Sequence, residues 1–191
     1  MIYVAFLRGI NVGGSSVIKM SDLKAVFEFL GFKRVVPVLA SGNIVFETSK
    51  CDLAVLRNQI QDKLAEKFGL ATMAIIRDGA QILELIKLNP FKGIPITANA
   101  KLHVTFLADL ARRFPKLPSK VSSPEFQIVR CTKGAVCSVV EPSPTAGTPE
   151  LMKLLESELG KQITTRTWNT IQNIGRVIES ANSSKIARVT G

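Results

Sequence analysis

A glycine-rich segment near the start of the chain is the first candidate for chemistry. It reads Arg8-Gly9-Ile10-Asn11-Val12-Gly13-Gly14-Ser15-Ser16 and follows an apolar stretch. Its glycines approach the spacing of a P-loop, in which backbone amides and a lysine hold phosphates where a helix begins. The lysine is absent here, and several residues separate the segment from the next predicted helix. The segment therefore fits a simpler anion cradle, made of Arg8 and loop amides, better than a nucleoside triphosphate site.

Two further segments carry similar polar residues. Ser41-Gly42-Asn43 lies between two predicted strands, and the segment 164–170 lies near the C-terminus. In a βαββαβ unit the end of the first strand and the turn between the second and third strands share one sheet edge, so we expect the first two segments to be neighbours. The third joins them only if the C-terminal helix packs back. The candidate ligand-binding residues are Arg8, Asn11, Gly13, Gly14, Ser41, Gly42, Asn43, Arg166, Trp168 and Asn169.

Each group of candidates has a binding interpretation and a structural one. Arginine pairs with phosphate, asparagine side chains donate hydrogen bonds, and glycines expose backbone amides. The same glycines also permit a tight chain reversal with positive φ. Thr165 or Thr167 is a suitable N-cap for a following helix, and Trp168 is a suitable core anchor. Both interpretations stay open.

The chain shows no recognisable catalytic or metal-binding motif. His103 is the single histidine and lies in an apolar stretch, so a multi-histidine metal site is excluded. Asp22, Asp52 and Asp78 stand near predicted helix starts, where they interact with the helix dipole. We expect no cofactor and no metal, and whether the protein is an enzyme stays open.

The three cysteines predict no disulfide. A turn at Lys133-Gly134 places Cys131 opposite Val136 and Arg130 opposite Cys137. The two thiols then point to opposite faces of the sheet. Reduced cysteines are typical of a cytosolic chain, and the first residues lack the basic start of a signal peptide.

The formal net charge of +10 favours anionic partners, although basic residues are scattered rather than clustered. The element order also raises the question of RNA recognition, in which aromatic residues of the first and third strands stack on bases. Only the first strand, with Tyr3, resembles that signature, and the strand after Asn43 lacks its aromatic positions. Nucleic acid and phosphorylated small molecules both remain candidate ligands. The alternative is that the basic surface binds no ligand and only aids solubility.

The first half of the chain reads as one βαββαβ unit. Residues 2–7, 35–39, 44–46 and 72–76 are predicted strands, and Pro37 marks the second of these as an edge strand or a bulge. Ser21 is the predicted cap of a first helix, which ends at Gly31. A second helix ends at Gly69.

The second half repeats part of this order. Asp78 and Gln81 form a capping box for a helix over 82–88, and residues 93–99 read as a linker. Strands are expected at 102–107, 126–131, 136–140 and 162–164, with a short helical or irregular segment after the first. Helices are expected from Thr148-Pro149 and over 168–178.

Several of these motifs together resemble a known family. Leu7 to Gly14, Ser41 to Phe46, Asn89-Pro90-Phe91 and Thr164 to Thr170 are similar to the bacterial domain of unknown function 1697. The resemblance implies a fold of two ferredoxin-like subdomains and no established activity, cofactor or catalytic residue. Ser15 stands where relatives often carry lysine, which weakens a phosphate cradle, and Thr167 stands where they often carry asparagine.

These observations predict an α+β protein of two tandem ferredoxin-like (βαββαβ) subdomains, with antiparallel sheets and helices on one face. The predicted parts are residues 1–77, a helix and linker over 78–99, and residues 100–191. We expect a cytoplasmic protein without a membrane anchor, since no apolar run approaches the ~20 residues that span a bilayer. The leading hypothesis is a binding module for an anionic ligand. There are two alternatives. One is an enzyme that acts on a small substrate between the subdomains, and the other is an interaction protein such as a homodimer.

Overall fold

The computed structural model describes residues 1–11, 17–108, 125–143 and 147–189, and these fall into two compact units. The first unit holds Met1–Ile86 together with the chain from Gln172, and the second holds Lys87–Ile171. The C-terminal helix is therefore shared between them, which the predicted boundaries did not include. Those boundaries stay a prediction. The predicted loop residues Gly13 and Gly14, and the segment expected after the first strand of the second half, lie outside the described residues.

The first unit contains a four-stranded antiparallel sheet. The elements along the chain are β1 (Ile2–Leu7), α1 (Met20–Phe29), β2 (Lys33–Val38), β3 (Asn43–Glu47), α2 (Leu53–Phe68) and β4 (Ala74–Asp78). The strands lie side by side in the order β2-β3-β1-β4. The order of strands and helices predicted from the sequence is the one observed.

Capping residues set the ends of these helices. The Asp52 carboxylate accepts from the Ala54 N–H at 2.6 Å at the start of α2, and Gly69, with φ of 63°, ends it. The predicted cap Ser21 is instead a residue of α1, which begins at Met20 after Lys19. The Ser21 hydroxyl is 3.5 Å from the Asp22 carboxylate, so it makes no cap.

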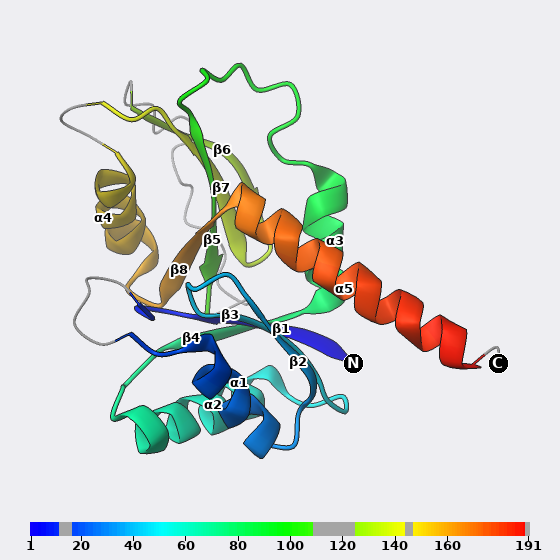
Figure 1. The fold of residues 1–191 in the computed structure, drawn as a ribbon. Coiled ribbons are helices and arrows are strands. Elements are labelled where there is room, and N and C mark those ends of the chain that lie inside the picture. Colours follow the sequence, from blue (N-terminus) through cyan, green and yellow to red (C-terminus); the bar gives the residue numbers. More distant parts are fainter. Residues whose placement is uncertain (12–16, 109–124, 144–146, 190–191) are drawn as a thin grey trace. The chain divides into compact units, whose positions relative to one another are not determined.

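Helices cover both faces of the first sheet, and not one face as predicted. Helices α1 and α2 bury a core of strand and helix side chains that includes Tyr3, Phe27, Phe46 and Ile60. The opposite face is covered within the first unit by α5 (Trp168–Val189) from Gln172 onward (Figure 1), and α3 (Gly79–Leu88) begins directly after β4. All six residues of β1 are buried for this reason. A Cβ at Gly79 would lie 3.1 Å from the Ile2 carbonyl oxygen and 3.4 Å from a side-chain carbon of Ile178, so the first residue of α3 must be small.

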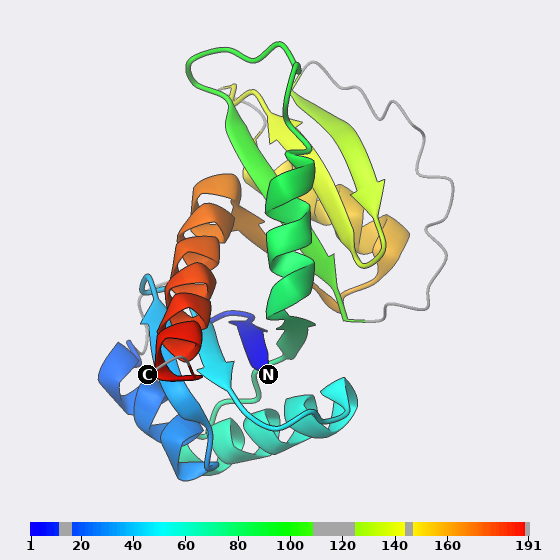
Figure 2. The same cartoon turned by 90° about the vertical axis from the view of Figure 1, so that its right-hand side faces the viewer.

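The second unit contains a similar sheet. Its elements are β5 (Lys101–Leu107), β6 (Phe126–Thr132), β7 (Ala135–Val140), α4 (Thr148–Leu159) and β8 (Ile163–Thr167). The strand order β6-β7-β5-β8 has the same pattern as the first sheet. Helix α4 packs against one face through Leu151, Leu155 and Leu159 (Figure 2). The predicted hairpin register is confirmed, with Arg130 opposite Cys137 and Cys131 opposite Val136, and all three cysteines are free. Among the described helices, none is both long and apolar enough to span a membrane.

Candidate functional site

The predicted neighbouring segments at the end of β1 do lie together. The Leu7 N–H donates to the Gly42 carbonyl oxygen at 2.8 Å. The next residue, Arg8, donates its backbone N–H to the Met73 carbonyl oxygen at 2.9 Å. We call residues 8–11 and 41–43 the loop junction. The end of β1, the turn between β2 and β3 and the start of β4 therefore meet at one edge of the sheet.

Asn11 uses its side chain to hold the loop junction. Its amide nitrogen donates to the Ile18 and Ala40 carbonyl oxygens, both at 3.0 Å, and its oxygen accepts from the Ile18 N–H at 2.8 Å. Its backbone φ of 56° lies in the left-handed region that asparagine tolerates better than most residues. The Asn11 amide thus links the backbone at Ile18 to the residue before Ser41.

The turn residues are equally engaged. Asn43 is fully buried and donates to the Val38 carbonyl oxygen at 3.0 Å and to the Ser41 hydroxyl at 2.9 Å. Gly42 has φ of 72° and is buried, and a Cβ there would lie 2.9 Å from the Cβ of Ile10. The loop junction is therefore held by the side chains that the sequence suggested for a ligand, with Arg8 half-buried beside them.

The 164–170 segment forms the end of β8 and the start of α5. The Thr167 hydroxyl accepts from the Thr170 N–H at 3.3 Å, so the capping interpretation is confirmed for Thr167. Trp168 is 9% exposed and packs edge-to-face on Phe91 with ring centroids 5.3 Å apart, which makes it a core anchor. Asn169 is exposed. Arg166, Trp168 and Asn169 belong to the second unit and the loop junction to the first, and a site shared by them stays a prediction.

Arg166 has a counterpart that sequence reasoning missed. Arg166 is opposite Val104 across β5 and β8, and Arg77 is opposite Val4 across β1 and β4. Each guanidinium donates at 2.8 Å to the carbonyl oxygen of its preceding residue. Burial lowers the pKa of each arginine to about 10. In each case the arginine is followed by the last residue of its strand, which caps the next helix. The order of arginine, capping residue and helix therefore occurs in both halves of the sequence and could have identified Arg77 as the counterpart of Arg166.

His103 lies in a buried polar cluster of the second unit. Its Nε2 is 3.2 Å from the Thr148 hydroxyl at the start of α4, and it stands opposite Ser138 across β5 and β7. The His103 Nδ1 and Ser138 Oγ atoms are buried and have no hydrogen-bond partner among the described residues. Burial, together with the charge of Lys101, lowers the pKa of His103. Across the described part of the chain, no three His, Cys, Asp or Glu side chains gather as metal ligands would.

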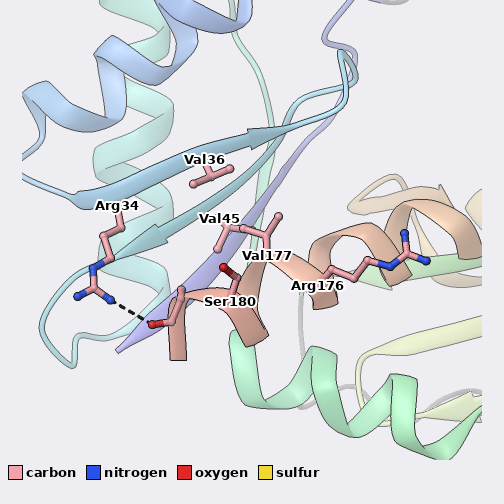
Figure 3. Close-up of a pocket in the computed structure, with 7 residues that line it drawn as sticks. Arg34, Val36, Val45, Arg176, Val177 and Ser180 are labelled. Carbon is pink, nitrogen blue, oxygen red and sulfur yellow. Dashed lines mark hydrogen bonds between the residues drawn. The ribbon is translucent and has the colours of Figure 1, made fainter. Parts of the chain in front are cut away.

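A hollow of about 580 Å³ opens in the first unit beside α5 (Figure 3). Its lining comes from β2, β3 and α5, and we call it the α5 hollow: Arg34, Val36, Val45, Arg176, Val177, Ser180 and Ala181. In Figure 3, Arg34 and Arg176 lie at opposite ends of this group, and the three valines lie between them. The hollow thus has an apolar floor and an arginine at each end, and the Arg176 side chain extends outward from the valines.

An irregularity in β2 places Arg34 in the α5 hollow. The pairing of β2 with β3 shifts between Lys33 and Val36, and Arg34 has φ of 49°, which non-glycine residues rarely adopt. Bulges of this kind re-aim a side chain. The Arg34 Nε is 3.4 Å from the Glu47 carboxylate, and its Nη1 donates to the Ala181 carbonyl oxygen at 3.2 Å. Arg34 is therefore held in one orientation by β3 and α5 together.

Arg176 has a different environment. It is exposed on α5, and its Nη1 donates to the Asn173 side-chain oxygen at 2.8 Å. No carboxylate among the described residues forms an ion pair with it. The sequence offered no signal for this pair of arginines, because they are distant in the chain and only the packing of α5 brings them to one hollow.

Comparisons with known proteins agree with this fold. A solved structure of a conserved bacterial protein from Streptococcus pneumoniae is similar, with a TM-score of 0.68 and 19% identity over 93% of this chain and 98% of that chain. At that identity the likeness shows the fold alone. No curated protein matches the chain. A family model described as "Protein of unknown function (DUF1697)" matches residues 1–133. The chain therefore belongs to the DUF1697 family.

Proposed function

We propose that this protein is a pair of ferredoxin-like subdomains that binds a small anionic molecule in the α5 hollow. Two strand orders of the same pattern support the subdomain assignment, since each sheet places its first strand between its third and fourth. The observation that carries the binding function is a hollow with an apolar floor and an arginine at each end.

The size of the hollow favours a small molecule over nucleic acid. Ligand pockets usually have volumes of about 300–1,000 Å³ and apolar walls with a few polar groups. The α5 hollow, at about 580 Å³, falls in that range. Single-stranded nucleic acid is usually bound by aromatic side chains on which bases stack. The hollow has no aromatic residue in its lining.

The loop junction has a structural role in this proposal. The side chains of Asn11 and Asn43 hold backbone carbonyls of the chain itself. A ligand would have to break those bonds before it could accept from the same amides. Arg34 and Arg176 are therefore better candidates than the loop junction for binding the anionic ligand that the net charge favours.

Titration with 8-anilinonaphthalene-1-sulfonate, an apolar fluorescent anion, tests the proposal. We expect saturable binding that Arg176→Ala weakens by about tenfold, the effect of losing one hydrogen bond to a charged group, and that Arg34→Ala weakens less. Arg130→Ala is the matched control, because Arg130 is an exposed arginine of β6 outside the hollow.

Two outcomes would contradict the proposal. One is equal weakening by Arg130→Ala, which would mean that net charge alone attracts the dye. The other is saturable binding of a labelled oligonucleotide that Arg34→Ala and Arg176→Ala weaken while the dye does not bind at all.

A further inference from the structure

The two arginines of the α5 hollow differ in how far their charge is already balanced. Arg34 has the Glu47 carboxylate 3.4 Å from its Nε, and the two side chains are only 30% and 17% exposed. Arg176 has an uncharged partner, the Asn173 amide. Because the Glu47 charge offsets that of Arg34, the hollow keeps about one net positive charge, at the Arg176 end.

This asymmetry decides what each arginine offers a ligand. Arg34 is fixed by Glu47 and Ala181, and its remaining N–H groups suit an acceptor without a full charge. A second anion placed there would face the Glu47 carboxylate, and like charges repel at such distances. Arg176 suits a carboxylate or a phosphate, with which arginine forms charge-assisted hydrogen bonds.

Between the arginines the surface is aliphatic. Val36 is 39% exposed, although it is a large apolar residue, and Val45 and Val177 line the same floor. Covering such side chains with a ligand's hydrocarbon removes apolar surface from water, which stabilises the complex. The floor contains no group that would select a polar ligand body.

We propose that the α5 hollow takes a monoanion with an aliphatic body, and that Arg176 is the residue that selects the charge. The anionic group lies at Arg176, the hydrocarbon covers the valines, and Arg34 donates to whatever acceptor stands at the other end. This inference rests on the proposed binding function and adds the class of ligand. A fatty acid and an alkyl phosphodiester share this chemistry, because each carries one negative charge near neutral pH.

Three probes of equal chain length separate the charge states: octanoate, octanamide and octanedioate. Their binding is measured by ¹H–¹⁵N correlation spectra of the labelled protein, which report both affinity and place through the amides of Val36, Val45 and Val177. We expect octanoate to bind about tenfold more tightly than octanamide. We expect octanedioate to gain no more than about twofold over octanoate, the statistical effect of two equivalent ends. Methyl octyl phosphate, a singly charged phosphodiester, distinguishes a carboxylate head from a phosphate head in a further titration.

Variants assign the selection to one residue. In Arg176→Gln the preference for octanoate over octanamide should fall to about onefold, whereas Arg34→Gln should weaken both probes and keep the preference. Glu47→Gln keeps the side chain's shape and removes its charge, so it should make octanedioate bind several-fold more tightly than octanoate.

The results separate the two proposals. If no probe shifts the valine amides, the proposed binding function is wrong. If octanoate and octanamide bind equally at those amides, or if octanedioate binds far more tightly to the unmodified protein, the hollow binds ligands but the monoanion assignment is wrong. If Arg34→Gln removes the charge preference and Arg176→Gln keeps it, the selecting residue is Arg34.

Discussion

Replacing Gly42 with alanine tests how closely the turn between β2 and β3 packs on the end of β1. Gly42 has φ of 72°, and its carbonyl oxygen accepts a hydrogen bond from the Leu7 N–H at 2.8 Å. A Cβ at this position would lie 2.9 Å from the Cβ of Ile10 and 3.1 Å from the Cβ of Leu7. Both neighbouring atoms sit next to backbone, so neither can swing away as a side-chain tip would.

The expected cost has two parts. A left-handed conformation costs an L-residue roughly 1–2 kcal/mol relative to glycine. Overpacking a buried contact adds about 1–3 kcal/mol. Gly31→Ala isolates the first part, because Gly31 has φ of 80° and no atom within 4 Å of its Cβ position. Gly42→Ala should therefore lower the free energy of unfolding by about 2–5 kcal/mol, and by about 1–3 kcal/mol more than Gly31→Ala.

Urea denaturation of the parent and both variants, followed by circular dichroism, measures this difference. The comparison holds when the three transitions share one m-value, because a changed m-value signals a changed unfolded or native state. Equal losses of stability in Gly42→Ala and Gly31→Ala would refute the close packing of the loop junction. The turn would then have room to present its backbone to a ligand.

Two further predictions concern the buried polar cluster of the second unit. The folded-state pKa of His103 is lowered from 6.5, so the unfolded chain binds a proton at this residue more readily than the folded chain does. The stability that neutral His103 contributes is therefore fully present above pH 6.5. It falls as the pH drops toward the folded-state pKa, by up to about 1.4 kcal/mol per pH unit. Urea titrations at pH 7.5, 6.5 and 5.5 measure this slope, and because His103 is the single histidine, a slope of the same size in His103→Gln would contradict the assignment. The Ser138 hydroxyl is buried without a partner among the described residues, so Ser138→Ala should leave stability unchanged or raise it by up to about 1 kcal/mol. Thr105→Val is its control, since the Thr105 hydroxyl lies 2.7 Å from that of Thr165 and its loss should cost about 1 kcal/mol in the same assay; a larger loss in Ser138→Ala would show that this hydroxyl has a partner.

Local patterns in the sequence were enough to predict most elements and several caps. Asp78 and Gln81 form the expected capping box, with the Asp78 N–H donating to the Gln81 side chain at 3.3 Å and the Asp78 carboxylate accepting from Ala80 at 2.9 Å. Pro37 does lie in an edge strand that contains a register shift. These features depend on residues a few positions apart, so the sequence carries them directly.

The polar segments show where such reasoning stops. The sequence predicted that the glycine-rich segment and the Ser41–Asn43 turn would be neighbours, and they are. It could not predict that the amides of Asn11 and Asn43 would donate to carbonyls of the chain itself, because an asparagine bound to its own backbone and one bound to a ligand have the same local pattern. The choice depends on which carbonyls the fold leaves nearby.

The sequence by itself determined the strands, the helices, their order and the positive charge of this protein. Tertiary structure alone decided the α5 hollow. The guanidinium of Arg34 meets the Ala181 carbonyl oxygen across 147 positions of sequence. The apolar stripe of Ile171, Ile174 and Ile178 predicts that α5 is buried along one side, but a stripe does not specify its partner. Only the packing of that helix on the open face of the first sheet brings two distant arginines to one apolar surface.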